Sequence, residues 1–465
     1  MTTLDHRTAP AFHIDAATFF THSRPSRDQR ASDGRVQREV VPLASNAEGP
    51  PLAGRPDPLA ILQSQESDRD PSLIPLRYAR MAADPFAFLR GAAAIMASDL
   101  SRLPNSGINA QLCGDAHLAN FGMFASAERT LVFDLNDFDE TLPGPFEWDV
   151  KRLAASIAVA ARGNGVKPKG AQRAAAAAVE SYRSTMARLS DMRTMDVWFS
   201  RLDVDVLLER ARKTALSGAI VKASEKARRS TGDTALAKLT EVRDGRRRFR
   251  SQPPVLVPVA DENRDEAVER FAPLYEGYLQ SLAPDRIALL SRYSFVDLAH
   301  KVVGVGSVGT RAWVLLLESG NGDWLLLQLK QANSSVLETF LGESRFANSG
   351  KRVVVGQRVL QASGDPFLGW FEAGDEVAHD YYVRQLKDMK GSIDATLLRK
   401  EALTDYARVC GAVLARAHAR AGDASTISGY LGDTDEFDEA VATFATAYAD
   451  ITQADHAALV ASITR

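Results

Sequence analysis

GDAHLANFG, at residues 114–122, decides the fold when it is compared with a glycine-rich stretch that comes much later, at residues 304–330. Within it, Asp115 and Asn120 lie five positions apart. At this spacing one loop can present an aspartate that accepts a proton from an attacking hydroxyl and an asparagine whose amide oxygen ligates Mg²⁺. Alone the pair is weak support for such a site, because Asp and Asn are common turn residues that hydrogen-bond their own backbone.

An apolar hairpin follows this loop and ends in carboxylates. Residues 121–124 and 131–133 are predicted as its two strands, and the second runs directly into Asp134-Leu-Asn-Asp-Phe-Asp-Glu140. Carboxylates at the end of a buried strand suit Mg²⁺, which prefers oxygen ligands and shares them with phosphates. A solvated acidic turn is the alternative. A calcium EF-hand loop is excluded, because Phe138 occupies its fifth ligand position and both the central Gly and the terminal Glu are missing.

The later stretch VVGVGSVG, at residues 302–309, fits the pattern G-x-G-x-x-G. In a dinucleotide-binding fold such a turn opens a helix. Here residues 310–317 are β-branched and apolar, which predicts a strand instead. A glycine loop between two strands can cover nucleotide phosphates with unobstructed backbone amides. We therefore predict cofactor-binding residues in this loop: Gly304, Gly306, Ser307 and Gly309.

A lysine ends the strand that follows the next turn, Trp324-Leu-Leu-Leu-Gln-Leu-Lys330. Period-two alternation puts Leu325, Leu327 and Leu329 on one face and Lys330 on the other. A lysine in this place is usually only a strand terminus, but its position after a glycine hairpin favours binding to phosphates. Three residues are candidates for its partner: Glu338, Glu343 and Gln357.

These segments resemble the aminoglycoside and choline kinase branch of the protein-kinase superfamily. Residues 113–120 resemble its His-Gly-Asp-x-His-x-x-Asn loop, with Cys113 in place of the first His, and residues 137–139 resemble its Asp-Phe-Gly metal motif. The resemblance implies that Asp115 is the catalytic base, that Asn120 ligates the metal, and that Lys330 pairs with the α- and β-phosphates. Counting forward from Asn120 favours Asp134 as the second metal ligand, whereas counting back from Asp149 favours Asp137, our first choice.

The order of these segments is the reverse of the usual one. Residues 380–389 resemble the strand and hinge that contact adenine, which assigns Gln385 and Leu386 to cofactor binding. Residues 402–421 have helical apolar spacing and resemble the helix that normally leads into the catalytic loop, yet that loop has already passed. The resemblance therefore implies an α+β, two-lobed, circularly permuted kinase-like fold, with the catalytic loop N-terminal to the glycine-loop lobe.

From about residue 55 the chain is identified as a member of an uncharacterised bacterial family, domain of unknown function 2252. Membership supplies no substrate. The stretches that carry the resemblance are RYARM, PFAFLRG, GDAHLANFG, FDLNDFDE, EWDVKRLAAS, GVGSVGTR and YYVRQLKDMKGS.

Composition and patterning divide the chain into four expected segments. Residues 1–55 are rich in Arg, Ser, Pro, Ala and Asp and predict a flexible arm. Residues 56–290 are expected to form the mainly helical section of the C-lobe with the catalytic and metal loops, 291–392 an N-lobe-like sheet, and 393–465 the helical remainder of the C-lobe. The basic stretch at 222–250 is expected to be a solvated helix and turn, so nucleic acid is not an expected partner.

The 465 residues carry a net charge of −3, two cysteines and no apolar run of membrane-spanning length. With no signal-peptide core in view, we expect a cytoplasmic protein without a membrane partner. Its expected function is ATP- and Mg²⁺-dependent phosphoryl transfer to a hydroxyl of an unknown small molecule or protein. Two alternatives stay open. ATP bound in reverse would transfer AMP to a protein, and a pseudokinase would only bind nucleotide, although the retained Asp115, Asn120 and Lys330 argue against the latter.

Overall fold

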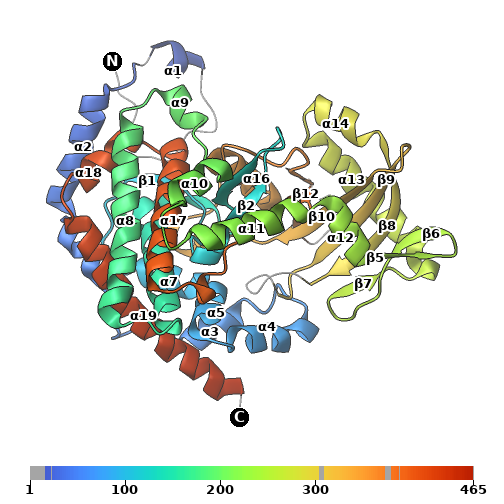
Figure 1. The fold of residues 1–465 in the computed structure, drawn as a ribbon, viewed down its shortest axis with the longest axis horizontal. Coiled ribbons are helices and arrows are strands. Elements are labelled where there is room, and N and C mark those ends of the chain that lie inside the picture. The colour runs from blue at the N-terminus through green and yellow to red at the C-terminus, as the bar shows by residue number, and fades with distance from the viewer. Residues whose placement is uncertain (1–15, 22, 303–307, 372–378, 387, 464–465) are drawn as a thin grey trace.

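The computed structural model describes residues 16–21, 23–302, 308–371, 379–386 and 388–463. One antiparallel sheet of six strands lies beside a body of long helices (Figure 1), which confirms the α+β class. The strand order is β11-β12-β10-β9-β8-β7. The strands span β7 Leu256–Pro258, β8 Tyr293–Lys301, β9 Ala312–Ser319, β10 Trp324–Ala332, β11 Gly369–Trp370 and β12 Asp380–Gln385.

The central strand β10 carries the predicted lysine and has a partner on each side. Lys330 is in register with Ala312 of β9 and with Tyr382 of β12. The connection from β8 to β9 contains the glycine loop, of which Gly304, Gly306 and Ser307 lie outside the described residues. Gly309 is described, and its φ of +90° is a conformation that favours glycine.

The two faces of the sheet are buried against different elements, as the alternation along β10 predicts. Leu325, Leu327 and Leu329 pack in one cluster with Tyr278 of α13 (Arg264–Gln280). Leu326 packs in another cluster under α12 (Gly232–Leu239) and the hairpin of β5 (Thr240–Arg243) and β6 (Arg246–Phe249). The apolar residues at 235–249 of the basic stretch therefore cover this face of the sheet, whereas most of its Lys and Arg side chains are exposed, as expected for a solvated helix and turn.

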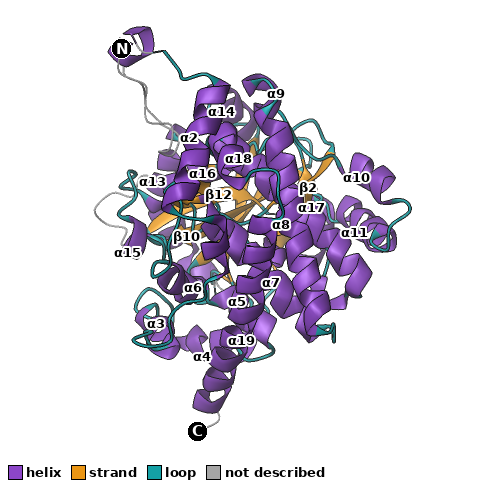
Figure 2. Cartoon of the chain, turned by 90° about the vertical axis from the view of Figure 1, so that its left-hand side faces the viewer, coloured by secondary structure: helices purple, strands orange, loops and turns teal. Residues whose placement is uncertain are grey.

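The helical body is built around α7 (Phe146–Gly163), α8 (Pro168–Ser190), α17 (Lys400–Ala421) and α19 (Glu436–Ile463). Figure 2 shows these helices in front of the sheet. Alanines line their contacts, and small side chains let helix backbones approach closely. At Gly411 of α17 a Cβ would overlap the carbonyl oxygen of Ala178 in α8, so only glycine fits there.

The structure differs from the expected flexible arm over residues 27–47. Helix α2 (Arg27–Val40) packs against α18 (Ala424–Leu431), and a Cβ at Gly34 would overlap the carbonyl oxygen of Thr426. Arg38 donates to the carbonyl oxygens of Gly429 and Tyr430 at 2.5 and 2.6 Å. The arm is ordered here because its small and basic residues meet a complementary helix. Residues 1–15 lie outside the described ranges.

The boundary expected at residue 290 also falls elsewhere, because β7 joins the sheet and α13 packs on it. Two short strand pairs lie within the helical body: β1 with β4, and β2 with β3. The remaining elements are α1 Ala16–Thr21, α3 Pro58–Ser64, α4 Ile74–Met81, α5 Pro85–Gly91, α6 Ala93–Leu100, β1 Asn109–Leu112, β2 Phe121–Ala125, β3 Leu131–Leu135, β4 Leu142–Pro145, α9 Thr194–Trp198, α10 Val204–Ala211, α11 Ser217–Arg229, α14 Pro284–Leu290, α15 Glu338–Leu341 and α16 Ser349–Leu360.

Candidate functional site

Two strand pairs hold the two predicted loops side by side. Leu112, at the end of β1, pairs with Leu142, at the start of β4, and Phe121, at the start of β2, pairs with Leu135, at the end of β3. The loop at 113–120 and the acidic segment at 136–141 each connect one pair to the other. The backbone amide of Asn136 donates to the carbonyl oxygen of Asn120 at 2.8 Å. The pairing therefore brings Asp115 and Asn120 close to the carboxylates at the end of β3.

The backbone of the loop at 113–120 is fixed by Asp149 in the first turn of α7. The amides of Cys113 and Gly114 donate to its carboxylate at 2.8 and 3.1 Å. The φ of Gly114 is +84°, and a Cβ there would overlap the carbonyl oxygen of Glu140. On its other side, Asp149 Oδ2 lies 3.2 Å from Nε2 of His418 in α17. Sequence reasoning missed His418, because nothing in its spacing connects it to the loop.

Asp115 presents one carboxylate oxygen to the protein and leaves the other available. Its Oδ1 accepts from Arg152 of α7, with Nε at 2.8 Å and Nη2 at 2.7 Å. Its Oδ2 lies 3.5 Å from Nε2 of His117. Asn120 donates from Nδ2 to the carbonyl oxygen of Asp115 at 2.6 Å, which leaves its amide oxygen for another partner. The loop is thus arranged to offer two oxygen ligands or acceptors to a bound molecule.

Lys330 extends from the sheet to the acidic segment at 136–141. Its ammonium pairs with Asp139 Oδ2 and lies 3.8 Å from Asp137 Oδ1. Tyr382 of β12 donates to Asp139 Oδ1 at 2.8 Å. Burial alone would lower the pKa of Lys330, but Asp137 and Asp139 raise it above its usual value. The lysine is therefore a fixed cation between the two halves of the chain.

The partner of Lys330 is not among the three residues suggested by the sequence. Glu338 accepts from the Ser335 amide at 3.0 Å and lies 3.6 Å from Nε of Arg352 in α16. Glu343 is exposed, and Gln357 donates to Gln361 at 2.9 Å. The acids beside Lys330 come from the acidic segment at 136–141.

Asp137 and Asp134 face different surroundings. Asp137 lines the cleft with its side chain 38% exposed, and its Oδ1 accepts no hydrogen bond from the described residues. Burial would raise the pKa of Asp137, but Lys330, Arg384 and Lys390 hold it below its usual value. Such an oxygen fits a divalent cation, which needs an ionised ligand that other donors have left free.

Asp134 points away from this cleft. It is 6% exposed, accepts from the Leu135 amide at 2.9 Å and lies 3.7 Å from Nη2 of Arg420 in α17. Its burial raises its pKa. The geometry therefore favours Asp137 over Asp134 as the second candidate ligand, with Asn120, for a divalent cation.

Gln385 and Leu386 do not line the cleft that contains Asp115 and Asp137. The Gln385 amide donates to Asp365 Oδ2 at 2.5 Å, and its side chain lines a separate cavity with Asn136 and Lys390. Leu386 is 8% exposed and packs in the cluster formed with α12. Helix α12 packs against Leu386, and the assignment of these two residues to cofactor binding stays a prediction.

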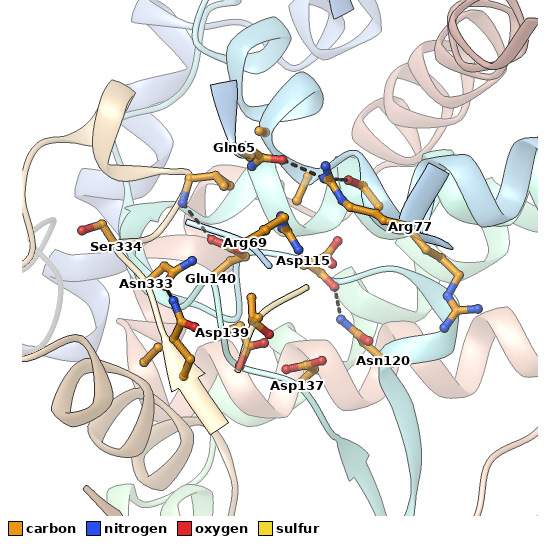
Figure 3. A pocket seen from close by; sticks show the side chains of 18 of the residues that line it. Gln65, Arg69, Arg77, Asp115, Asn120, Asp137, Asp139, Glu140, Asn333 and Ser334 are labelled. Carbon is orange, nitrogen blue, oxygen red and sulfur yellow. Dashed lines mark hydrogen bonds between the residues drawn. The ribbon is translucent and has the colours of Figure 1, made fainter. Parts of the chain in front are cut away.

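The cleft encloses about 140 Å³, which is less than a typical small-molecule site. Figure 3 shows Arg69, Asp115 and Arg77 in the upper part of the cleft in this view, with Asp139, Asp137 and Asn120 below them. Asp115, Asn120 and Asp137 therefore share one cleft, whose wall continues onto the segment that follows Lys330. The lining residues that sequence reasoning missed are chiefly Gln65, Arg69, Arg77, Arg90, Asp139 and Glu140.

Gly309 meets the edge of this cleft through its neighbours. Its carbonyl oxygen accepts from the Asp70 amide at 2.8 Å, and Arg69 Nη1 donates to the carbonyl oxygen of Val308 at 2.6 Å. Thr310, the next residue, lines the cleft. The described end of the glycine segment is therefore attached to the arginine side of the cleft through Arg69 and Asp70.

His117 makes the free energy of unfolding depend on pH. Burial lowers its pKa to about 4, with Arg152 and Arg90 adding to the effect of burial and Asp115 opposing it. As pH falls from about 6.5 to about 4, this histidine binds a proton in the unfolded chain but stays neutral in the folded protein. The free energy of unfolding should therefore fall with acidification, by about 3 kcal/mol from this residue at 1.36 kcal/mol per pKa unit.

Denaturant titrations of the wild type and His117→Gln at several pH values measure this contribution. The variant should lose about 3 kcal/mol less than the wild type between pH 7 and pH 4. Glu140, whose pKa burial raises to about 7, has the opposite effect on stability but is present in both proteins, so it cancels in the comparison. Parallel curves for the two proteins would contradict the neutral, buried state of His117.

Comparisons with known proteins identify a family and no further relative. A family model described as "Uncharacterized protein conserved in bacteria (DUF2252)" matches residues 69–462. No curated protein and no solved structure matches the chain. Two further findings hold for the residues that the structure describes. No helix among them is long and apolar enough to span a membrane, and no three of their His, Cys, Asp or Glu side chains form a group that could hold a metal ion.

Proposed function

The chain belongs to the bacterial family of domain of unknown function 2252, and from its site we propose an ATP- and Mg²⁺-dependent phosphotransferase that acts on a hydroxyl group. One observation carries the proposal. Lys330 contacts Asp139, 191 positions earlier in the chain, where Asp137 shares a cleft with Asp115 and Asn120. A general base, a pair of magnesium ligands and a phosphate-binding lysine are the groups that phosphoryl transfer requires.

The arrangement of elements supports a circularly permuted kinase-like fold within this proposal. In protein kinases a glycine loop covers the phosphates, and the lysine is on the third strand. Here Lys330 is on β10, which follows β8, the segment at 302–311 and β9. Helix α17, although late in the sequence, packs behind the early catalytic loop, where Tyr406 donates to the carbonyl oxygen of Leu118 at 3.2 Å. Two lobes, the sheet and the helical body, would then meet at the cleft.

In the proposed reaction, the acceptor hydroxyl lies against Asp115 Oδ2. Its oxygen attacks the γ-phosphorus of ATP, the bond from that phosphorus to the β–γ bridging oxygen breaks, and ADP leaves. The hydroxyl proton passes to Asp115, whose Oδ1 stays bound to Arg152. Lys330 would bind the phosphates and is held in place by Asp139, in the role that a helix carboxylate has in protein kinases.

Asn120 and Asp137 fit the magnesium requirement. Mg²⁺ is usually held by one or two protein ligands together with substrate phosphates, so a site with few acidic residues is suitable. When bound, the ion neutralises charge on the transferring phosphoryl group. Asp137 supplies an oxygen without a hydrogen-bond donor among the described residues, and Asn120 supplies its amide oxygen.

Transfer of AMP to a protein is a second candidate, favoured by the position of Leu386. Because α12 packs beside this residue, the expected adenine contact is covered, and a nucleotide bound in the reverse direction would not need it. Incubation with γ-labelled and α-labelled ATP plus cell extract separates the two reactions. Label transferred only from the γ position supports phosphoryl transfer, and label transferred only from the α position contradicts it.

Nucleotide binding can be tested without knowing the acceptor. ATP with Mg²⁺ should raise the melting temperature of the wild type, because a ligand at 100 times its Kd stabilises by about 2.7 kcal/mol. Lys330→Ala should weaken ATP binding by about tenfold or more, because a charge-assisted contact to phosphate is lost. Lys351→Ala is the matched control, since Lys351 lies over the Trp370 ring and outside the cleft. An equal ATP response in both variants would remove Lys330 from the site.

A further inference from the structure

Three arginines in the cleft have no role in the reaction described above: Arg69, Arg77 and Arg90. Arg77 belongs to α4 and Arg90 to the last turn of α5, while Arg69 precedes both helices. Figure 3 shows Arg69 and Arg77 across the cleft from Asp137 and Asp139. The cleft therefore has a wall of carboxylates paired with Lys330 and an opposite wall of guanidinium groups.

Arg77 is fully buried, yet its hydrogen-bond partners are neutral. Its Nη2 donates to Gln65 Oε1 at 2.9 Å, and its other contacts are carbonyl oxygens at 3.5 Å. Its Nε has no acceptor, and within the described ranges no carboxylate forms an ion pair with it. Removing a charge from water without an opposite charge is costly, so a buried arginine normally has a carboxylate partner.

Another interior arginine of this chain follows that rule. Arg55 is bound by two carboxylates, Asp99 at 2.8 Å and Asp455 at 2.7 Å. Although burial opposes it, these two acids raise the pKa of Arg55, whereas burial lowers the pKa of Arg77 to about 10. The difference lies in location. Arg55 is a structural cation, and Arg77 lines a cleft into which a ligand could bring the missing negative charge.

Arg90 repeats this pattern on the neighbouring helix. Its Nε is buried without an acceptor, and no ion pair to it exists among the residues that the structure describes. Guanidinium groups bind the oxygens of phosphates in pairs, which is why arginine is common where phosphate is recognised. Two guanidinium groups without carboxylates match a phosphate monoester, whose charge at neutral pH is about −1.5 to −2.

We propose that Arg77 and Arg90, together with Arg69, bind a phosphate monoester group of the acceptor whose hydroxyl faces Asp115. This inference rests on the proposed phosphotransferase function and gives it a substrate class: a small molecule that already carries a phosphate. The same wall disfavours cationic acceptors, because like charges repel in a desolvated cleft. It therefore separates this protein from the aminoglycoside and choline kinases that its loop resembles.

The test uses inorganic phosphate as the probe and the full chain. Its affinity is measured by titration calorimetry, alone and with Mg²⁺ and a non-hydrolysable ATP analogue present. The variants are Arg77→Gln and Arg90→Gln, and Arg90 is only partly buried, so at least this variant should fold. Arg183→Gln is the matched control, because Arg183 pairs with Asp438 between α8 and α19 and outside the cleft. Acetate replaces phosphate in a parallel titration.

The expected result is saturable phosphate binding that both cleft variants weaken by about tenfold or more and that the control retains. The Kd for phosphate should be the same with the nucleotide analogue present. No phosphate binding, equal binding in all variants, tighter binding of acetate, or displacement of phosphate by the analogue would each overturn the inference. Loss of the nucleotide response alone, with phosphate binding intact, would overturn the proposed function and still support the anion site.

Discussion

Asp137→Asn is expected to abolish the Mg²⁺-dependent component of ATP binding and to lower transfer of γ-label by about 10³-fold. The reason is that a metal ligand in phosphoryl transfer supplies several kcal/mol of transition-state stabilisation, at 1.36 kcal/mol for each factor of ten. Asp137 has an oxygen free of hydrogen-bond donors among the described residues and shares the cleft with Asn120. The measurement is ATP affinity with Mg²⁺ and with a chelator, followed by label transfer into cell extract.

Asp134→Asn is the control for this experiment. Asp134 belongs to the same acidic stretch as Asp137 but lies beside Arg420. Its replacement should therefore lower stability and leave Mg²⁺-dependent binding nearly unchanged. Melting temperatures of both variants without ligand separate loss of folding from loss of the metal site. If Asp134→Asn abolishes the Mg²⁺ effect and Asp137→Asn retains it, the assignment of Asp137 is wrong.

Asp115→Asn should lower turnover by roughly 10²–10⁴, the range for losing a general base, and should leave ATP binding nearly intact. The base contacts the acceptor hydroxyl and not the nucleotide, which explains why the two effects separate. Asparagine is preferable to alanine here, because its amide oxygen can still accept from the buried Arg152. Label transfer and ATP affinity are measured on the same preparation.

Two results would contradict this role of Asp115. Full activity in Asp115→Asn would end its assignment as the base. A parallel loss of ATP affinity would mean that Asp115 acts through the nucleotide or its metal. Arg183→Gln, far from the cleft, controls for the general effect of altering a partly buried ion pair.

The sheet and the loops were predictable from sequence because their signals are local. Alternation along residues 324–330 places Leu327 and Lys330 on opposite faces, and that is how they lie. The clustering of Asp115, Asn120 and Asp137 was expected from their spacing around one hairpin. The pairing of β2 with β3, which are close in sequence, brings Asn120 and the acidic segment together, and Asp149 of α7 then fixes the backbone of the loop.

The arginine wall and the support of the catalytic loop could not be predicted in this way. Arg77 and His418 reach the site from helices far from the loop in sequence, and their spacing follows ordinary helical periodicity. Asp139 was not considered as the partner of Lys330, because its place in the resemblance corresponds to a glycine. Leu386, which the resemblance places at the adenine, packs against apolar residues of α12, and the basic composition of 222–250 gives no indication of this contact. All of these are tertiary contacts, for which one sequence gives no direct signal.

Helix α17 supports the loop at 113–120 directly through Tyr406 and indirectly through His418, which contacts Asp149, and these contacts can form only late in translation. His418 lies 269 positions after Asp149, and Tyr406 lies 288 positions after Leu118. At ~5–20 residues per second, a ribosome needs roughly 15–60 s to make that length of chain. During this interval the loop at 113–120 has left the ribosome without the helix that supports it. Under the proposed function, a nascent chain should therefore bind nucleotide only after α17 has been synthesised.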